Sequence, residues 1–247
     1  MKLDSFFEEN SRVALGFSGG VDSSYLLYEG IMCGADIQPY YIKTVFQPQF
    51  ELDDARRLAR QLGVTLKVLE INILSIPAIA GNPSDRCYHC KRELFGVLQR
   101  QALADGYSAI IDGTNASDDA GDRPGMRALR ELSVRSPLRE CGLTKDDVRQ
   151  FSKEAGLFTW DKPAYACLAT RIPTDEAITA EALARVEKSE DALRRLGFAD
   201  FRVRVFNGAA RLQFSRRQMD KALAEVDSIK KSITQYFPVV LLDLDGR

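Results

Sequence analysis

A loop of glycine and serine residues follows a short apolar segment near the start of the chain. It reads Phe17-Ser18-Gly19-Gly20-Val21-Asp22-Ser23-Ser24 and leads into a segment of helical character. Gly19 and Gly20 let the backbone approach an anion closely and adopt positive φ angles. The N-terminus of the following helix adds unpaired N–H groups and the positive end of a dipole. Hydroxyl donors would come from Ser18, Ser23 and Ser24. Such a loop suits pyrophosphate, and it is not a Walker motif because no Gly-Lys-Ser/Thr follows.

A pair of cysteines is the second group that could do chemistry. Cys87 and Cys90 are spaced as Cys-x-x-Cys, which presents two thiolates to one metal or cluster or forms a redox pair. Arg86 and Lys91 lie beside them in the sequence. These cations favour the thiolate over the thiol, so the pair is a candidate metal or redox site.

The remaining cysteines divide into one candidate ligand and two ordinary residues. Cys167 lies in the stretch that ends the first predicted domain. With the Cys-x-x-Cys pair it would give three thiolates, which can hold an iron–sulfur cluster and leave one iron open. The only histidine, His89, would instead complete a zinc site. Cys33 and Cys141 are interpreted as inert core residues.

Alternating strand-like and helical segments must position these groups. The predicted strands are residues 12–17, 37–43, 64–71 and 108–112, and the predicted helices are residues 22–33, 50–62, 93–104 and 144–155. This alternation predicts an α/β fold with a parallel sheet covered on both faces, and with ligand-binding loops at one edge. The cysteine pair would lie just before the helix at 93–104. Asp112-Gly113-Thr114-Asn115 would follow the fourth strand, where Gly113, Thr114 and Asn115 could line a nucleotide cleft.

The pattern changes between about Lys162 and Ile178. A long amphipathic helix is expected at 179–196, then strands at 201–206 and 210–214, a helix at 216–233 and a strand at 238–244. The Asn207-Gly208 dipeptide between the first two strands is a strong hairpin signal. We therefore predict two domains, residues 1–165 and a smaller α+β domain at 166–247 that serves substrate binding or oligomerisation.

The composition excludes several classes of protein. The 247 residues include 34 Lys and Arg and 35 Asp and Glu, so the net charge is −1 and a general nucleic-acid coat protein is excluded. No apolar run approaches the roughly 20 residues that span a bilayer, and the acidic N-terminus is not a signal peptide. The odd number of cysteines argues against a secreted disulfide framework. We expect a cytoplasmic protein with no membrane partner.

The glycine-serine loop resembles the SGGxDSS loop of the PP-loop ATP pyrophosphatases, which cleave ATP between the α- and β-phosphates. This resemblance implies an adenine nucleotide alpha hydrolase-like domain, with Asp22 as the Mg²⁺ ligand and adenine bound near Lys43-Thr44. Over nearly its whole length the chain is similar to the LarE-type ATP-dependent sulfur transferases of nickel-pincer nucleotide cofactor synthesis. The matching segments are the loop, Asp112–Asn115, Arg123-Pro124-Gly125, Arg135–Leu138, Cys167–Pro173 and Phe201–Val205.

The second resemblance implies a two-step reaction. A carboxylate of a pyridinium dicarboxylate mononucleotide attacks the α-phosphorus of ATP and releases pyrophosphate, and a sulfur nucleophile then displaces AMP to leave a thiocarboxylate. Arg202 and Arg204 alternate on one face of a strand. By resemblance they bind the phosphate of the substrate, and Arg171 provides a further anion contact.

Two sources of sulfur occur in this family. In one, a cysteine at the position of Cys167 gives up its own sulfur and becomes dehydroalanine. In the other, three cysteines hold a 4Fe–4S cluster whose open iron carries a sulfide. Because this chain has Cys87 and Cys90 as well as Cys167, we expect the cluster version, with Cys167 and Asp22 as catalytic residues. A homo-oligomer and a sulfur donor protein are further expectations.

Other functions stay open at this point. A tRNA thiolation enzyme of the same superfamily would also pair the loop with cysteines, but the net charge of −1 weighs against a nucleic-acid partner. An ammonia-using synthetase would not need three clustered cysteines. A non-catalytic nucleotide-binding protein with structural zinc is the alternative outside the enzymes.

Overall fold

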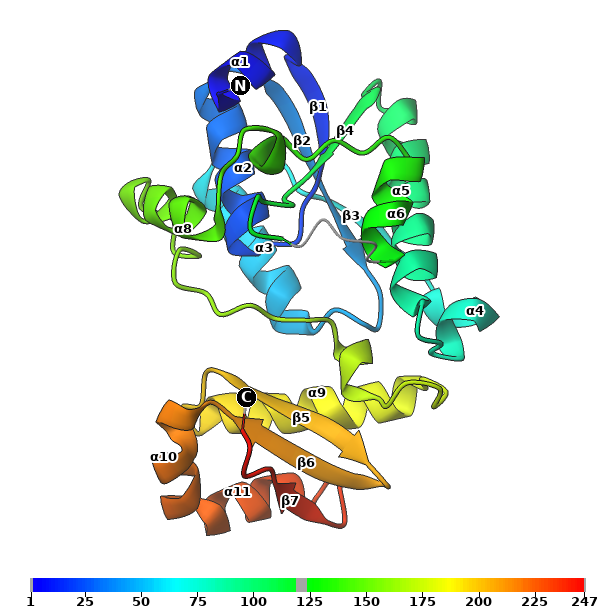
Figure 1. The fold of residues 1–247 in the computed structure, drawn as a ribbon, viewed down its shortest axis with the longest axis vertical. Coiled ribbons are helices and arrows are strands. Elements are labelled where there is room, and N and C mark those ends of the chain that lie inside the picture. Colours follow the sequence, from blue (N-terminus) through cyan, green and yellow to red (C-terminus); the bar gives the residue numbers. More distant parts are fainter. Residues whose placement is uncertain (1, 119–123, 247) are drawn as a thin grey trace. The chain divides into compact units, whose positions relative to one another are not determined.

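The computed structural model describes residues 2–118 and 124–246. The chain forms two compact units. The first unit contains the chain up to Asn72 and again from Asp85 to Ala164. The second contains Ile73–Ser84 and everything from Tyr165 onward. Figure 1 shows the helices and strands of both units in sequence colours.

A four-stranded parallel sheet forms the centre of the first unit. Its strands are β1 (Arg12–Gly16), β2 (Asp36–Lys43), β3 (Lys67–Glu70) and β4 (Ala109–Asp112). Their order is β3-β2-β1-β4, with every neighbouring pair parallel. The predicted α/β fold with a parallel sheet is confirmed. Because β1 lies between β2 and β4, the loop that follows β1 leaves the sheet at its interior rather than at an edge strand.

Helices cover both faces of this sheet. They are α1 (Leu3–Glu9), α2 (Val21–Met32), α3 (Gln49–Gln61), α5 (Arg86–Ala104), α6 (Pro124–Glu131), α7 (Pro137–Glu140) and α8 (Lys145–Glu154). Side chains alternate along a strand, so Leu15 of β1 packs with Leu26 of α2 on one face, while Ala14 packs with Leu98 of α5 on the other. This double burial explains why the central strand β1 is apolar after Arg12.

The helix that carries the cysteine pair begins earlier than the sequence pattern predicts. It starts at Arg86, not Glu93, so Cys87 and Cys90 lie in its first turns and not in the loop before it. No glycine or proline interrupts this stretch. Tyr88 fixes the extra turns against α6, since its hydroxyl donates to Glu131 at 2.7 Å. Figure 1 shows α5 and α6 side by side.

The second unit is an α+β structure. Its elements are η1 (Ile73–Ser75), α4 (Pro77–Ala80), η2 (Leu168–Arg171), α9 (Ala180–Arg195), β5 (Phe201–Phe206), β6 (Ala209–Phe214), η3 (Arg216–Gln218), α10 (Met219–Ala224), α11 (Val226–Ile233) and β7 (Val240–Leu242). The predicted hairpin forms, with positive φ at Asn207 (49°) and Gly208 (77°). The single helix predicted at 216–233 is wrong, because the backbone departs from helical geometry at Glu225.

An inserted segment completes the second unit. After β3 the chain contributes Ile73–Ser84 to this unit and then returns to the first. The backbone N–H of Ile178 donates to Ala80 at 2.7 Å, and the side chain of Asn82 donates to the carbonyl of Pro173 at 2.7 Å. These bonds tie the insertion to the segment between η2 and α9. The first domain predicted from the sequence, residues 1–165, includes Ile73–Ser84, which the structure assigns to the second unit.

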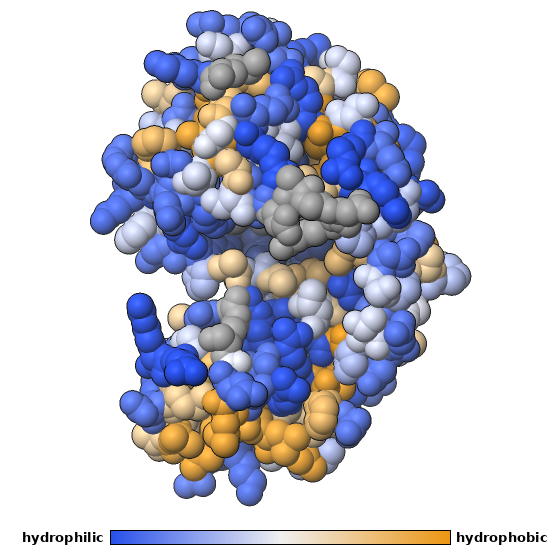
Figure 2. Space-filling view, in the orientation of Figure 1, coloured by the Kyte–Doolittle hydropathy of each residue, from blue (hydrophilic) through white to orange (hydrophobic). Residues whose placement is uncertain are grey.

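The surface of the second unit carries a group of exposed hydrophobic side chains. Figure 2 shows an orange area over its lower part, where α11 and β7 lie. The exposed large hydrophobic residues of this unit are Phe206, Leu223, Val226, Val239, Leu241 and Leu244. No helix in the described part of the chain is long and apolar enough to cross a membrane.

Candidate active site

The loop after β1 has the geometry of an anion-binding turn. Gly19 has a φ of +71°, which a side chain at this position would strain. Gly20 is the N-cap of α2, so the first N–H groups of that helix follow it directly. The hydroxyls of Ser18 and Ser23 lie 3.0 Å apart and hold the turn closed. The predicted loop thus lies between a buried strand and a helix N-terminus.

The loop after β4 packs directly on this turn. A Cβ atom at Gly113 would lie 2.8 Å from the backbone nitrogen of Ser23, so only glycine fits there. Asp112, which precedes it, is buried and accepts hydrogen bonds from the hydroxyls of Thr114 at 2.6 Å and Ser136 at 2.7 Å. The two loops predicted from sequence therefore form one site.

Two adjoining pockets open at this edge of the sheet. A polar pocket of about 240 Å³ is lined by Gly16, Ser18, Asp22, Ser23, Lys91, Phe95, Asp112, Gly113, Thr114 and Asp118. A more apolar pocket of about 160 Å³ is lined by Gly16, Phe17, Ser18, Tyr40, Tyr41, Ile42, Gln47, Glu51, Leu94, Phe95 and Leu98. They share Gly16, Ser18 and Phe95, so together they form a groove with one polar and one apolar end.

Asp22 is held in the polar pocket by two partners. Lys145 pairs with its Oδ2 at 2.5 Å, and the side-chain amide of Asn115 donates to its Oδ1 at 3.1 Å. Carboxylate and hydroxyl oxygens are the ligands that Mg²⁺ prefers. Asp22, Asp112 and Asp118 supply carboxylates around the pocket. The donor set therefore fits a magnesium ion.

Several predicted residues do not line these pockets. Ser24 is fully buried in α2, and its hydroxyl has no hydrogen-bond partner among the described residues. The Lys43 ammonium donates to the carbonyl of Gln47 at 2.5 Å, within its own loop. Asn115 acts on the pocket through Asp22 and does not line it. Arg123 lies outside the described residues.

Three lysines near the loop were missed by the sequence interpretation as site residues. Lys91 lines the polar pocket, and Lys145 pairs with Asp22. Lys162 pairs with Asp54 at 2.7 Å and donates to the carbonyl of Gly19 at 3.3 Å. Only Lys145 carries a local signal, because a cation at the first position of a helix opposes the helix dipole.

The cysteines of the predicted cluster lie in different units. Cys87 is exposed and Cys90 half-buried on α5, three residues apart and therefore on one face of the helix. Arg86 lies beside them, with its Nη2 at 3.7 Å from the Cys87 sulfur. His89 pairs with Asp85 at 3.2 Å. Cys167 is half-buried at the N-cap of η2 in the second unit.

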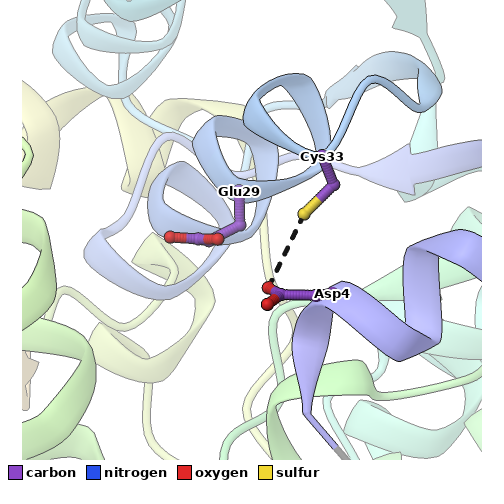
Figure 3. Close-up of side chains that lie close together, drawn as sticks. All are labelled: Asp4, Glu29 and Cys33. Carbon is purple, nitrogen blue, oxygen red and sulfur yellow. Dashed lines mark hydrogen bonds between the residues drawn. The ribbon is translucent and has the colours of Figure 1, made fainter.

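The interpretation of Cys33 as a core residue is wrong. Cys33 is exposed at the end of α2, where it lies with Asp4 and Glu29 within 4.8 Å of one another (Figure 3). Burial and the neighbouring carboxylates raise the pKa of its thiol, which donates to Asp4 at 3.8 Å. These neighbours therefore favour the thiol of Cys33 over its thiolate. Cys141 is half-buried against the main core, close to the expectation.

The arginines predicted to bind substrate lie around a buried carboxylate in the second unit. Arg171 and Glu190 are both fully buried and pair at 2.8 Å. Glu190 also accepts from the Tyr165 hydroxyl at 2.5 Å and from the backbone of Val203 at 3.1 Å. Burial, and then the charge of Glu190, raise the pKa of Tyr165. Glu190 therefore orders the start of β5 and the segment before η2.

A pocket of about 220 Å³ opens beside this ion pair, lined by Arg171, Ile172, Pro173, Arg204, Val205, Phe206 and Arg211. The Nη2 of Arg171 is buried and has no hydrogen-bond partner in the described chain. Burial, followed by the charge of Arg171, lowers the pKa of Arg204. The pocket therefore concentrates positive charge with one donor unused, which favours an anion.

Arg202 lies deeper than Arg204 and does not line this pocket. It is buried, donates to the carbonyl of Phe201 at 2.6 Å and lies over the ring of Tyr165 at 5.1 Å. Burial and the nearby charge of Arg171 lower its pKa to about 10. Arg211, which the sequence interpretation did not single out, takes a place in the pocket wall.

Known proteins resemble the chain over almost its whole length. It is 39% identical to the uncharacterized protein slr1717 of Synechocystis over 99% of this chain and 92% of that protein. It is 32% identical to the pyridinium-3,5-bisthiocarboxylic acid mononucleotide synthase of Lactiplantibacillus plantarum over 99% of this chain and 90% of the synthase. A tRNA-specific 2-thiouridylase of Pseudothermotoga lettingae is 27% identical over 61% of the chain and 54% of its own length. No protein-family model matches the chain.

The similarity to the synthase extends through both units, and the 2-thiouridylase shares part of the chain. The parallel sheet of the first unit is consistent with a PP-loop domain. The chain therefore belongs to the LarE family of ATP-dependent sulfur transferases in the PP-loop superfamily.

Proposed function

We propose that this enzyme uses ATP to activate a carboxylate of a pyridinium dicarboxylate mononucleotide and converts it to a thiocarboxylate. The observation that carries the proposal is the groove at the end of β1, which joins an apolar pocket to a polar one. An adenine ring suits the apolar end between Tyr40 and Phe95, and the phosphates suit the polar end at Ser18 and Ser23. The LarE relative is named as a synthase of the bisthiocarboxylic acid mononucleotide.

Residues of the first unit have separate tasks in the activation step. The N-terminus of α2 and the hydroxyls of Ser18 and Ser23 orient the phosphates for attack at the α-phosphorus. Asp22 would hold Mg²⁺, which neutralises charge on the leaving pyrophosphate. Lys91 brings a second positive charge to the same pocket. These fixed groups would stabilise charge that builds up in the transition state.

The arginine pocket of the second unit supports the choice of a phosphate-bearing substrate. Guanidinium groups bind phosphate through paired, charge-assisted hydrogen bonds. Arg204 and Arg211 line the pocket, and the unused Nη2 of Arg171 is buried beside it. A mononucleotide phosphate would satisfy all three groups. We assign Arg202 to the support of this site, because its guanidinium lies against Tyr165.

The experiment for this function measures exchange of radioactive pyrophosphate into ATP. Exchange that needs both Mg²⁺ and the pyridinium dicarboxylate mononucleotide supports the proposal. The second step is identified by mass spectrometry of the product, in which one oxygen is replaced by sulfur. Exchange that needs tRNA instead would assign the chain to the thiouridylase reaction. Absence of exchange with either substrate would point to a non-catalytic nucleotide-binding protein.

We further propose that Cys87, Cys90 and Cys167 hold a 4Fe–4S cluster. The first two share one face of α5, and the Arg86 guanidinium lies beside the Cys87 sulfur. A cluster with three thiolate ligands keeps one iron open and would supply a sulfide as the nucleophile. A sulfur donor protein would restore the sulfide after each transfer.

The sulfur source is tested by spectroscopy and mass spectrometry. Anaerobically reconstituted protein should show the absorption of an iron–sulfur cluster and contain iron and sulfide in equal amounts. Each of the three Cys→Ala variants should lose this absorption. The zinc alternative predicts bound zinc and no such absorption. The sacrificial alternative predicts activity in Cys87→Ala and Cys90→Ala, a single turnover, and a mass loss of about 34 Da at Cys167, the mass of H₂S.

We propose that a second copy of this chain covers the apolar area of the second unit. β7 pairs with β6 alone among the described strands, and Val239 and Leu241 are exposed on or beside it. Open strand edges with apolar side chains are sites of association. Sedimentation of wild type against Leu241→Glu tests this; an equal mass for both would reject the interface.

A further inference from the structure

Asp22 belongs to a closed ring of hydrogen bonds that joins three segments of the first unit. Its Oδ1 accepts from Asn115, whose own Oδ1 accepts from the backbone N–H of Ser117 at 2.8 Å. The Ser117 hydroxyl accepts from the backbone N–H of Lys145 at 2.9 Å, and the Lys145 ammonium returns to Asp22. The ring therefore fixes the carboxylate from both sides.

Lys145 has an unfavourable place in its own helix. It is the first residue of α8, where the helix dipole repels a cation. Asp146 and Asp147 in the same turn, and a capping box between Thr144 and Asp147, offset that repulsion. The helix would form without a lysine there. The position of Lys145 is therefore explained by its ion pair with Asp22 and not by the stability of α8.

The ion pair occupies the oxygen that a metal would need. Both side chains are partly exposed, Asp22 at 22% and Lys145 at 31%, so the pair can open without unfolding its surroundings. Asp22 lines the polar pocket directly. An ammonium and a divalent cation cannot both approach the same carboxylate oxygen closely, because like charges repel.

We propose that Lys145 is a placeholder cation for the magnesium site. Without nucleotide it neutralises Asp22 and keeps the carboxylate turned into the pocket. With ATP and Mg²⁺ bound, Asp22 would hold the metal, and Lys145 would release the carboxylate and turn its ammonium towards the phosphates. Lys145 thus makes metal binding depend on nucleotide binding. This inference rests on the proposed Mg²⁺ and ATP site at Asp22.

The test measures Mg²⁺ binding without nucleotide, and then binding of the non-cleavable analogue α,β-methylene-ATP with Mg²⁺ present. Lys145→Met should bind free Mg²⁺ about fivefold more tightly, because the competing charge is gone, and the analogue about tenfold more weakly. Lys153→Met, an exposed lysine at the other end of α8, is the matched control and should change neither.

A second variant separates competition from damage to the fold. In an Asp22→Asn background, Lys145→Met should no longer change the affinity for Mg²⁺, since the two effects are coupled through one carboxylate. Unchanged or weaker Mg²⁺ binding in Lys145→Met, while wild type binds the analogue with Mg²⁺, would overturn the placeholder role alone. Failure of wild type to bind Mg²⁺ and the analogue would overturn the proposed nucleotide site as well.

Discussion

The two proposed anion sites of this protein handle charge in opposite ways. At the loop of the first unit, the carboxylate of Asp22 is already paired with Lys145 and accepts a hydrogen bond from Asn115. In the second unit, Arg171, Arg204 and Arg211 line one pocket, and a buried donor of Arg171 is unused. The Asp22 carboxylate of the first site is therefore balanced without a ligand, whereas the second site keeps positive charge that a ligand would balance.

The difference follows from what each site is built from. The backbone N–H groups and hydroxyls around Gly19 carry no net charge and can still bind phosphate. Without a ligand they therefore add little electrostatic repulsion to the folded state. Guanidinium groups placed close together repel one another, and the Arg171–Glu190 pair is buried at the centre of that group. We infer that ligand binding stabilises the second unit more than the first.

The largest effect is expected at the balanced site. Asp22→Asn should lower pyrophosphate release at least about a thousandfold, because the charge on the leaving group would no longer be neutralised by a bound metal. Circular dichroism should show an intact fold, since Asn115 can still bond to the new side chain. Release of pyrophosphate at the wild-type rate would contradict the role of Asp22 at the first site.

A large loss of stability is expected at the buried pair of the second unit. Glu190→Gln leaves Arg171 as a buried unpaired charge, which costs about 3–5 kcal/mol of unfolding free energy. Asp191→Asn is the matched control, because its partner Arg194 and its own side chain are partly exposed. Urea titrations followed by circular dichroism measure this loss of stability. Similar unfolding midpoints for the two variants would mean that the Arg171–Glu190 pair is not needed for the stability of this unit.

A more moderate effect is expected from the pocket wall. Arg211→Ala should raise the KM for the mononucleotide about tenfold and leave the KM for ATP unchanged, since one charge-assisted contact is lost. Arg217→Ala, an exposed arginine of η3, should change neither. Steady-state kinetics with each substrate varied in turn would show the split. Parallel changes in both KM values would contradict a separate phosphate site.

The smallest effect concerns the carboxylate that holds Arg211. Asp243 accepts from Gln213 at 2.7 Å and pairs with Arg211 at 2.8 Å, and the Gln213 bond is the main cause of its lowered pKa. The unfolded chain therefore binds more protons just below pH 3.8, and this contribution to stability is lost as the pH falls through that range.

Asp243→Asn should accordingly lower the Tm by about 2–4 °C at pH 7 and by less at pH 3. Differential scanning calorimetry at both values checks the sign. A difference that grows towards pH 3 would assign the stabilisation to another group. A result without any pH dependence would show that the Arg211 contact is maintained by geometry and not by charge.

Local patterns were sufficient for much of the fold and for part of the site. The strands β1, β2 and β4 were predicted to within a residue or two, because each is an apolar run bounded by turn residues. The glycine-serine loop and Gly113 were recognised for the same local reason. The start of α5 was missed because its first turns are polar and depend on contacts of Tyr88 with α6.

Long-range partners could not be predicted in this way. Lys145 meets Asp22 across 123 residues, and no spacing rule joins them. Arg211 is an ordinary strand residue until Asp243 and the pocket are known. The exposure of Cys33 likewise depends on how α1 meets the end of α2. Ser24 looked like a phosphate ligand, but the helical turn carries it into the core.

The insertion of Ile73–Ser84 has a consequence for how the chain reaches its native state. This segment is synthesised early, yet Asn82 bonds to Ile172 and Pro173, which follow about 90 residues later. Closing so long a loop is entropically costly unless the intervening chain is already compact. Residues 85–164, which belong to the first unit, are that chain. Folding is therefore expected to be ordered. The first unit forms first, and the second unit assembles last, when residues 165–246 pack against Ile73–Ser84.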